Sequence, residues 1–408
     1  MSAYLDLSAA NPFLKEWYDG QKVQNLAYDE NPFLAVVPKD EDTGGKYYPV
    51  PIQYEVSQGR SSTFATGQAN QAALAAAEFM VTRKKDYSFA TVDNETLECA
   101  ASDKGTFMRT ATAAIDSAIQ AATISVSSAL FRSGTGTIGK IATGGITSGV
   151  ITLTNPADVV QFGVNQTLQA NATDGGTPRA ALGYVIARSI RNGTITVASS
   201  GLGGSAASPT SWAAGDFLLV QGDNNLKISG LPAWLPMTDP TSSDNFYGVN
   251  RSADYRLFGI NYDGSGQPIE EALIDHALLM GREGVSPSHF VTNFGSMAAL
   301  VKALGTRKVY VDLKGPAQIG FRAVEVDGPN GPIKAFADRS CQAAQGFMLK
   351  MNTWKLISIG PVPKILRYED RVEMLRVYSA DAAEARIAYY ANLISTAVGK
   401  NGQTTLSA

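Results

Sequence analysis

Residues 134–140 read GTGTIGK and match two short patterns that can bind phosphate, G-x-G-x-x-G and G-x-x-x-x-G-K. Such a loop binds phosphate when a strand precedes it and a helix follows, because backbone N–H groups and the helix end then point at the anion. Here a long predicted helix precedes the loop, and Gly- and Thr-rich β sequence follows it. Ile141 also stands where a Ser or Thr would hold Mg²⁺. We interpret the loop as a flexible exit from the helix, with nucleotide binding as an alternative.

The residue types that bind metals are few. The chain has two histidines, His276 and His289, and two cysteines, Cys99 and Cys341. No second His or Cys stands at ligand spacing, so the sequence does not predict a zinc site. Two cysteines make no disulfide framework, and we expect both to be buried thiols.

Two charged groups could carry other chemistry. Glu270 and Glu271 stand at the start of a predicted helix, where the helix dipole explains acidic residues better than acid/base catalysis does. The basic run Arg83 to Lys85 is interpreted as a solvated strand edge or as a partner for an acidic patch on a neighbouring subunit. No G-x-S-x-G nucleophile motif is present. We predict no catalytic, cofactor-binding or metal residues, and no cofactor.

Composition limits the classes of protein further. The 408 residues are 44% hydrophobic and only 17% charged, with a net charge of −3, which excludes strong electrostatic binding of nucleic acid. The length suits two or three compact parts. The N-terminal sequence lacks the features of a secretory signal, and no apolar run reaches the ~18 residues of a membrane span.

The first hundred residues predict an arm and a long hairpin rather than a catalytic domain. Residues 1–40 read as an extended arm whose large apolar groups, such as Trp17, Phe33 and Leu34, are expected to be buried on other subunits. An arm folded back on its own domain is the alternative.

A strand pair is predicted next, from Lys46 to Tyr54 and from Phe79 to Phe89. The charge-poor segment Ser57 to Ala77 would join the two strands at a tip. Few globular enzymes begin this way, whereas a subunit that grips its neighbours would.

Residues 103–132 form the strongest predicted helix, with Ser102 as its N-cap. Its apolar stripe is expected to pack on a sheet containing a final long strand, Met374 to Leu393. In that strand Ala385, Ile387 and Tyr389 alternate with more polar positions, as a half-buried strand requires.

Residues 134–223 differ in composition, with eight charged residues in 90 positions. YVIARSIRNGTITVAS is a hairpin signal around Asn192-Gly193, the usual pair of a type I′ turn, and GVITLTN and DFLLVQGD add strands. We predict a small β-barrel or sandwich inserted into the main domain, with its two ends close together.

The rest of the chain alternates helices and strands. Helices are predicted at 268–283, between Pro268 and Gly284, and at about 295–304, after Asn293. The predicted strands are KVYVDL, FRAVEV, PIKAFA, GFMLKM and WKLISI.

Several blocks, in this order, resemble the major capsid proteins of tailed phages: NPFLAVVPKDEDTGGKYYPVPI, GLPAWLP, PIEEALIDHALLMGREG, VYVDLKGPAQIGFRAVEVDGPNGPIKAFADRSC, MNTWKLISIGP and MLRVYSADAAEARIAYYANL. The resemblance covers most of the chain outside 134–223. It implies an α+β fold of the Hong Kong 97 type, with an N-terminal arm, an E-loop, a P-domain on a long spine helix and an A-domain. The domains expected from it are 1–40 (arm), 41–95 (E-loop hairpin), 96–133 (spine helix region), 134–223 (inserted β domain), 224–284 (second part of the P-domain), 285–365 (A-domain) and 366–408 (final strand and C-terminus).

The resemblance also implies a function and partners. A major capsid protein self-assembles as pentamers and hexamers into the icosahedral shell around double-stranded DNA, within the virion, after synthesis in the host bacterial cytoplasm. Its partners would be copies of itself, a portal protein and, through weak non-specific contact, packaged DNA. The low charge of residues 134–223 suits either a contact with the adjacent capsomer or a seat for a decoration protein. Because the arm starts at Met1 without a long extension, we expect a separate scaffolding protein, and we expect no membrane partner.

Two other classes of protein remain open. The Gly- and Thr-rich middle suggests a phage tail or surface-adhesion β protein, and GTGTIGK suggests a nucleotide-using enzyme.

Overall fold

The computed structural model describes residues 31–94, 104–305, 309–314, 320–329, 331–366, 374–378 and 380–407. The chain forms two compact units. Unit 1 contains residues up to Leu34, Lys84–Ile228 and Ser358–Ala391, and unit 2 contains Ala35–Arg83, Ser229–Ile357 and Asn392–Ala408.

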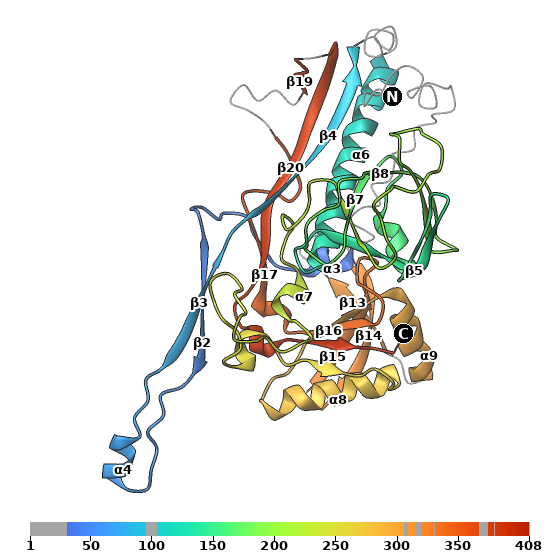
Figure 1. The fold of residues 1–408 in the computed structure, drawn as a ribbon. Coiled ribbons are helices and arrows are strands. Elements are labelled where there is room, and N and C mark those ends of the chain that lie inside the picture. Colours follow the sequence, from blue (N-terminus) through green and yellow to red (C-terminus); the bar gives the residue numbers. More distant parts are fainter. Residues whose placement is uncertain are drawn as a thin grey trace. The chain divides into compact units, whose positions relative to one another are not determined.

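Unit 1 is built on a long helix and a sheet, as predicted. Helix α6 (Lys104–Leu130) lies beside β4 (Lys84–Asp93) and β20 (Ala382–Ser395), which pair antiparallel (Figure 1). Ala118 and Ala122 of the helix are buried against Ala90, Ala385 and Ile387 of the strands. The small alanine side chains let the helix approach the sheet closely. The predicted packing of the stripe on the final strand is confirmed for this part of the helix, whereas Ser102 lies outside the described residues.

The predicted single strand from Met374 to Leu393 is wrong. It is two strands, β19 (Met374–Arg376) and β20, paired antiparallel with Met374 opposite Ala385. The N–H of Val377 donates to the carbonyl of Ala382 across the turn. A further short strand, β18 (Lys364–Ile365), also pairs with β20. The alternation holds at Ala385, Ile387 and Tyr389, which are buried, but Ala388 is buried as well because both faces of β20 are covered there.

The expected placement of Phe33 and Leu34 on other subunits is also wrong. Both side chains are fully buried within their own chain, and the Phe33 ring packs at 5.1 Å from that of Phe131 in unit 1. Helix α3 (Pro32–Val36) makes this segment helical rather than extended. Trp17 lies outside the described residues.

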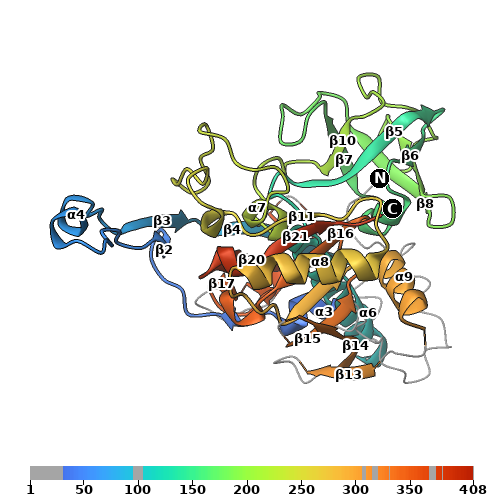
Figure 2. The same cartoon turned by 90° about the horizontal axis from the view of Figure 1, so that it is seen from below.

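The inserted segment, residues 134–223, forms a closed barrel. A barrel is one of the two predicted forms, and a sandwich is the other. The strands of the barrel run in the order β10-β5-β6-β9-β8-β7 (Figure 2). Its interior holds apolar side chains such as Ile141, Phe162 and Leu218. Its ends lie close together, because the N–H of Asn225 donates to the carbonyl of Thr135 at 2.9 Å. The strands are β5 (Thr137–Thr147), β6 (Val150–Leu153), β7 (Thr167–Asn171), β8 (Gly183–Ser189), β9 (Thr194–Ala198) and β10 (Phe217–Val220), with a 3₁₀ turn at Pro156–Gln161.

The hairpin at Asn192-Gly193 is present but its turn is not type I′. Gly193 has φ of 64°, whereas Asn192 does not have positive φ. Strands β8 and β9 pair from Ser189 opposite Thr194, so four residues form the loop instead of two. A type I′ turn needs positive φ at both central residues, and the longer loop removes that requirement.

Unit 2 contains a seven-stranded mixed sheet with two helices against it. The strand order is β11-β21-β16-β12-β15-β14-β13, and α8 (Ile269–Arg282) and α9 (Phe294–Leu304) supply buried side chains such as Leu273, Met280 and Leu300 to its core. Both helices agree with prediction, and Asn293 caps α9 by accepting from the N–H of Ser296 at 2.7 Å. The strands are β11 (Tyr262–Asp263), β12 (His289–Thr292), β13 (Val309–Lys314), β14 (Gly320–Gly328), β15 (Gly331–Ala337), β16 (Gln345–Leu349) and β21 (Gly402–Thr405).

Unit 2 also holds short elements and the predicted hairpin. β1 (Lys39–Asp40) pairs in parallel with β17 (Trp354–Ser358). The short helices are α7 (Leu231–Trp234), Tyr255–Leu257, Met351–Thr353 and Val398–Lys400. The hairpin consists of β2 (Tyr48–Glu55) and β3 (Ala75–Val81), with α4 (Phe64–Ala69) at its end. The returning strand therefore ends at Val81 rather than Phe89, and residues from Lys84 onward belong to β4 of unit 1.

Candidate assembly site: the hairpin and its anchor

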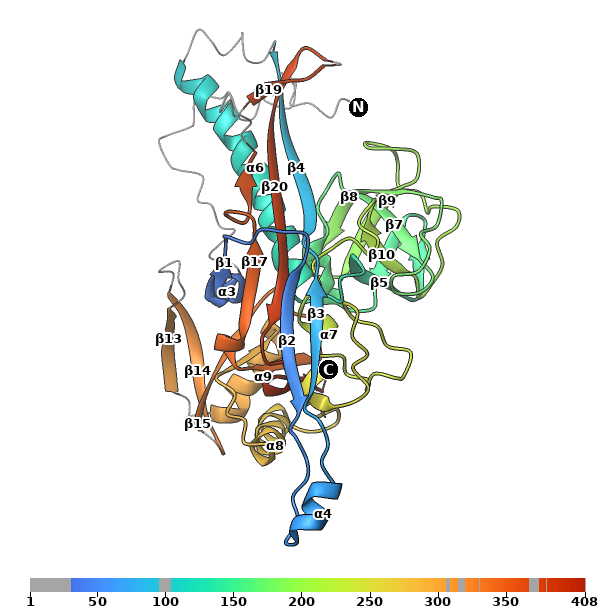
Figure 3. The same ribbon diagram turned by 90° about the vertical axis from the view of Figure 1, so that its left-hand side faces the viewer.

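The distal end of the hairpin presents uncovered apolar side chains. In α4, Phe64 is 86% exposed, and Val56 and Leu74 at the strand ends are each 56% exposed. Arg60 is the only charged residue among residues 56–74. Figure 3 shows α4 at the end of β2 and β3, away from the sheet of unit 2. Exposed apolar surface without charge is typical of a protein interaction site.

The root of the hairpin is fixed in an aromatic cluster of unit 2. Phe79 in β3 is fully buried, and its ring lies 5.3 Å from Trp234 and 6.2 Å from Phe246. Trp234 and Phe246 themselves meet edge to face at 5.0 Å. Such tilted contacts add stability beyond the burial of apolar area. The hairpin is therefore held at one end and uncovered at the other.

Hydrogen bonds from the backbone and from the Asn392 side chain reinforce the anchor. The N–H of Met80 donates to the carbonyl of Tyr247 at 3.1 Å, and the amide of Asn392 donates to the carbonyl of Thr82 at 2.6 Å. The same amide reaches the Tyr247 hydroxyl, which lies 2.7 Å from the hydroxyl of Ser229. Burial raises the pKa of Tyr247, so this hydroxyl stays protonated and able to donate.

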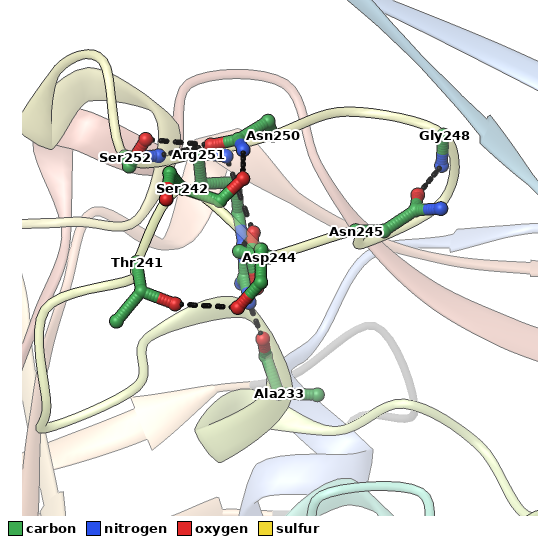
Figure 4. A network of polar contacts seen from close by, with 10 residues as sticks. Ala233, Thr241, Ser242, Asp244, Asn245, Gly248, Asn250, Arg251 and Ser252 are labelled. Atoms are coloured by element: carbon green, nitrogen blue, oxygen red, sulfur yellow. Dashed lines mark hydrogen bonds and ion pairs between the residues drawn. The ribbon is translucent and has the colours of Figure 1, made fainter.

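A network around Arg251 fixes the irregular loop that carries Phe246 and Tyr247 (Figure 4). The Arg251 guanidinium donates twice to Asp244, at 2.9 and 3.0 Å, and once to the carbonyl of Ala233, at 2.7 Å. It also lies 4.3 Å from the Phe246 ring centroid. The hydrogen bonds from Arg251 lower the pKa of Asp244, so the pair stays ionised. A bidentate pair fixes the relative position of its two residues. The loop has no helix or strand to fix its backbone, so this pair does so instead.

A pocket of about 310 Å³ lies beside strand β2 of the hairpin. Ile52 of β2 lines it together with Arg256, Glu283 and Lys400. The Arg256 guanidinium donates to the carbonyl of Tyr54, and the Tyr255 hydroxyl donates to Glu283 at 2.6 Å. The contact between Arg256 and Tyr54 holds strand β2, as the aromatic cluster holds strand β3.

The basic run splits into separate roles. Arg83 donates to the carbonyls of Thr43, Gly44 and Gly45 within unit 2. Lys84 donates to the carbonyl of Asn225 at 3.0 Å in unit 1, and burial lowers its pKa. Lys85 is exposed. The run is thus not one basic patch, and intrachain contacts explain Arg83 and Lys84.

The phosphate-loop interpretation gains no support from the fold. Residues 134–136 form a loop that leads directly into strands β5 and β6 rather than into a helix. The Lys140 ammonium lies 4.7 Å from the Phe217 ring centroid. Among the described residues, no group of three or more His, Cys, Asp or Glu could hold a metal ion, and no described helix is long and apolar enough to span a membrane. Cys341 is buried, with its Sγ 3.7 Å from the carbonyl oxygens of Gln342 and Gln345, and Cys99 lies outside the described residues.

Both histidines are structural. His276 is fully buried, with its Nδ1 2.5 Å from the Thr404 hydroxyl and its Nε2 2.7 Å from the carbonyl of Ile260. Since a carbonyl only accepts, Nε2 carries the proton and Thr404 donates to Nδ1. Burial lowers the pKa of His276 to about 4, and burial with Lys334 nearby lowers that of His289 to about 4.

Glu270 and Glu271 lie in the first turn of α8, as the helix-dipole interpretation of these two residues expects.

Unit 2 should lose stability in acid because of these histidines. A folded-state pKa below the unfolded value of about 6.5 means that the unfolded chain binds protons first, so stability falls as the pH drops from about 6.5 towards 4. For His276 the loss between pH 7.5 and 5 is roughly 2 kcal/mol. Urea unfolding followed by unit 2 tryptophan fluorescence should show this slope, and His276→Gln should reduce it by about half, because His289 still titrates. An unchanged slope in that variant would argue that another group titrates.

Sequence reasoning missed the anchor. Trp234 belongs to the block GLPAWLP, but no sequence pattern indicates that its side chain packs against Phe79 or Phe246. An available signal was the clustering of aromatic residues with Arg251 and Asp244 in a stretch without helix or strand periodicity.

Comparison with known proteins identifies the fold. No protein-family model matches the sequence. No curated protein matches it either. Among solved structures, a chain of the cyanophage A-1(L) capsid matches with a TM-score of 0.56 and 10% identity, over 100% of this chain and 99% of that chain. The capsid of Myoviridae phage XM1 (TM-score 0.44, 8% identity, 92% of each chain) and an encapsulin complex from Synechococcus elongatus (TM-score 0.46, 7% identity, 99% and 96%) are more distant matches.

The cyanophage match assigns the fold, and the other two matches are too distant to add to it. The chain has the α+β Hong Kong 97-type capsid fold with an inserted small β-barrel, as the resemblance implied.

Proposed function

We propose that this chain is the major capsid protein of a tailed phage and that it assembles as pentamers and hexamers into an icosahedral head shell around double-stranded DNA. The observation that carries the proposal is the agreement of the fold with a phage capsid chain along the whole length. The anchored hairpin with its uncovered apolar end supports it, because a shell subunit needs a surface that only neighbouring copies cover.

In this proposal the hairpin is the E-loop and α6 is the spine helix. Residues 285–365 would form the A-domain near the capsomer axis, and the role is structural rather than enzymatic. Portal and separate scaffolding proteins would be further partners, with a decoration protein at the barrel. The net charge of −3 limits contact with packaged DNA to weak, non-specific binding. The location would be the virion capsid, after synthesis in the host bacterial cytoplasm.

Sedimentation of the purified full-length chain, alone and coexpressed with a scaffolding protein, tests this proposal. We expect capsomers or closed shells. Trimers or tubes would instead favour a phage tail or surface-adhesion protein, whose observation in favour is the closed barrel. Small oligomers that stay small with a scaffold and bind nucleotide would favour the enzyme hypothesis.

A further inference from the structure

One buried lysine in unit 1 joins three parts of the fold. The Lys227 ammonium lies 2.5 Å from a carboxylate oxygen of Asp86, 3.0 Å from one of Asp223 and 3.0 Å from the Ser125 hydroxyl. Ser125 donates to the same Asp86 oxygen at 2.6 Å. Asp86 lies on β4, Ser125 on α6, and Asp223 and Lys227 where the chain leaves the barrel. We call these four residues the charge joint.

The charge joint holds more negative than positive charge. With both carboxylates ionised, one ammonium faces two anions, and the net charge is −1 in a largely buried place. Removing an uncompensated charge from water is costly unless it is paired. The buried net charge therefore destabilises the closed joint whenever both Asp86 and Asp223 are ionised.

Neighbouring groups do not supply the missing positive charge. Arg132, two residues after the end of α6, is paired with Asp158 at 2.8 Å, and that pair is itself buried. Lys84 of β4 donates to the Asn225 carbonyl rather than to a carboxylate.

The other titratable groups around the joint are a tyrosine and an acid. Tyr389 of β20 is buried beside Asp86, and its raised pKa keeps it neutral. Asp174 accepts from the Thr135 and Thr137 hydroxyls at 2.7 and 2.6 Å. A proton is therefore the available means of neutralising the joint.

A cavity of about 80 Å³ between α6 and the barrel reaches Asp223 and Lys227. Among the described residues, the Ser128 hydroxyl and the Arg132 Nε that line it have no hydrogen-bond partner. A cavity of this size holds roughly five waters, and these two groups would bind them. Asp223 also keeps 19% of its side chain exposed, so protons can reach it.

We propose that the charge joint is a proton-operated latch between the inserted barrel and helix α6, which closes more tightly when Asp223 is protonated and loosens when it is ionised. The protonated carboxyl leaves Lys227 and Asp86 as a neutral pair. The joint is then buried without net charge, and it opens less often.

The pKa of Asp223 supports this direction. Burial, and secondarily Asp86, raise it to about 6, against the opposing effect of Lys227. An acid with a raised folded-state pKa gains stability as the pH falls through that pKa. The ratio of closed to open joint should therefore rise about tenfold between pH 7.5 and 5.

Hydrogen exchange of the full-length chain tests the latch at the joint itself. The amides of Asn225 and Leu226, which donate to the carbonyls of Thr135 and Asp223, report its opening. After correction for the intrinsic exchange rate, their protection should rise about tenfold from pH 7.5 to 5. Global unfolding is the wrong readout, because His276 and His289 in unit 2 respond to pH in the opposite direction.

Three variants separate the latch from other causes. Asp223→Asn should be protected at pH 7.5 nearly as well as the wild type at pH 5, with no further rise. Asp86→Asn should shift the response to lower pH, because one raising influence on Asp223 is gone. Asp239→Asn, at an exposed acid of unit 2, should keep the wild-type response.

Two results would overturn the latch. One is protection in the wild type that does not change between pH 7.5 and 5. The other is an unchanged rise in Asp223→Asn. The wild-type profile decides even if that variant fails to fold, and none of these outcomes depends on whether the chain builds shells.

Discussion

A variant in which Asn-Gly replaces residues 56–74 should fold normally and fail to assemble. Glu55 and Ala75 are paired in the hairpin, so a two-residue turn can close it there. The change removes Phe64, whose burial on a neighbouring copy would contribute about 1.5–3 kcal/mol per contact. Because each copy would make this contact in the proposed shell, the loss would be repeated throughout it. Sedimentation should find only subunits or capsomers, and the urea midpoint should stay unchanged.

The point variant Phe64→Ala is the matched control for the deletion. It should weaken assembly partially, since Val56 and Leu74 remain exposed and available. Normal shells from the deletion would show that the tip of the hairpin makes no essential contact.

Phe79→Ala should destabilise the subunit by about 3–5 kcal/mol. The side chain is fully buried against Trp234 and Phe246, so its loss leaves a cavity and breaks both aromatic contacts. That is a large share of a typical total stability of about 5–15 kcal/mol. Urea unfolding monitored by tryptophan fluorescence measures it directly, since Trp234 is a partner.

Comparing Phe79→Ala with Phe64→Ala separates folding from assembly within one hairpin. The first variant should lose subunit stability, whereas the second should keep its stability and assemble less well. Equal stability of the two variants would mean that the aromatic cluster is not the anchor.

Local signals explain what the sequence could predict. Helix α9 begins at Asn293, whose side chain caps it, and helix α8 is bounded by Pro268 and Gly284 as those residue types favour. The barrel follows from strands that alternate apolar and polar residues in a charge-poor segment. In each case, residues close in sequence decide the structure.

Contacts between distant residues explain what it could not predict. Phe79 meets Trp234, and Phe33 meets Phe131, but an apolar side chain alone does not show which surface will bury it. For this reason, the sequence alone leads to the expectation that the apolar residues of the arm are buried on other subunits. The division between β19 and β20 lacks a Gly, Pro or Asn, so apolar residues on both sides of the turn read as one strand.

Electron cryomicroscopy of particles formed by the full-length chain tests the central claim most directly. The account predicts closed icosahedral shells in which residues 56–74 of each copy lie on a neighbouring copy, with Phe64 buried in that contact. Particles without closed shells, or shells in which Phe64 stays exposed or is covered by its own chain, would contradict it.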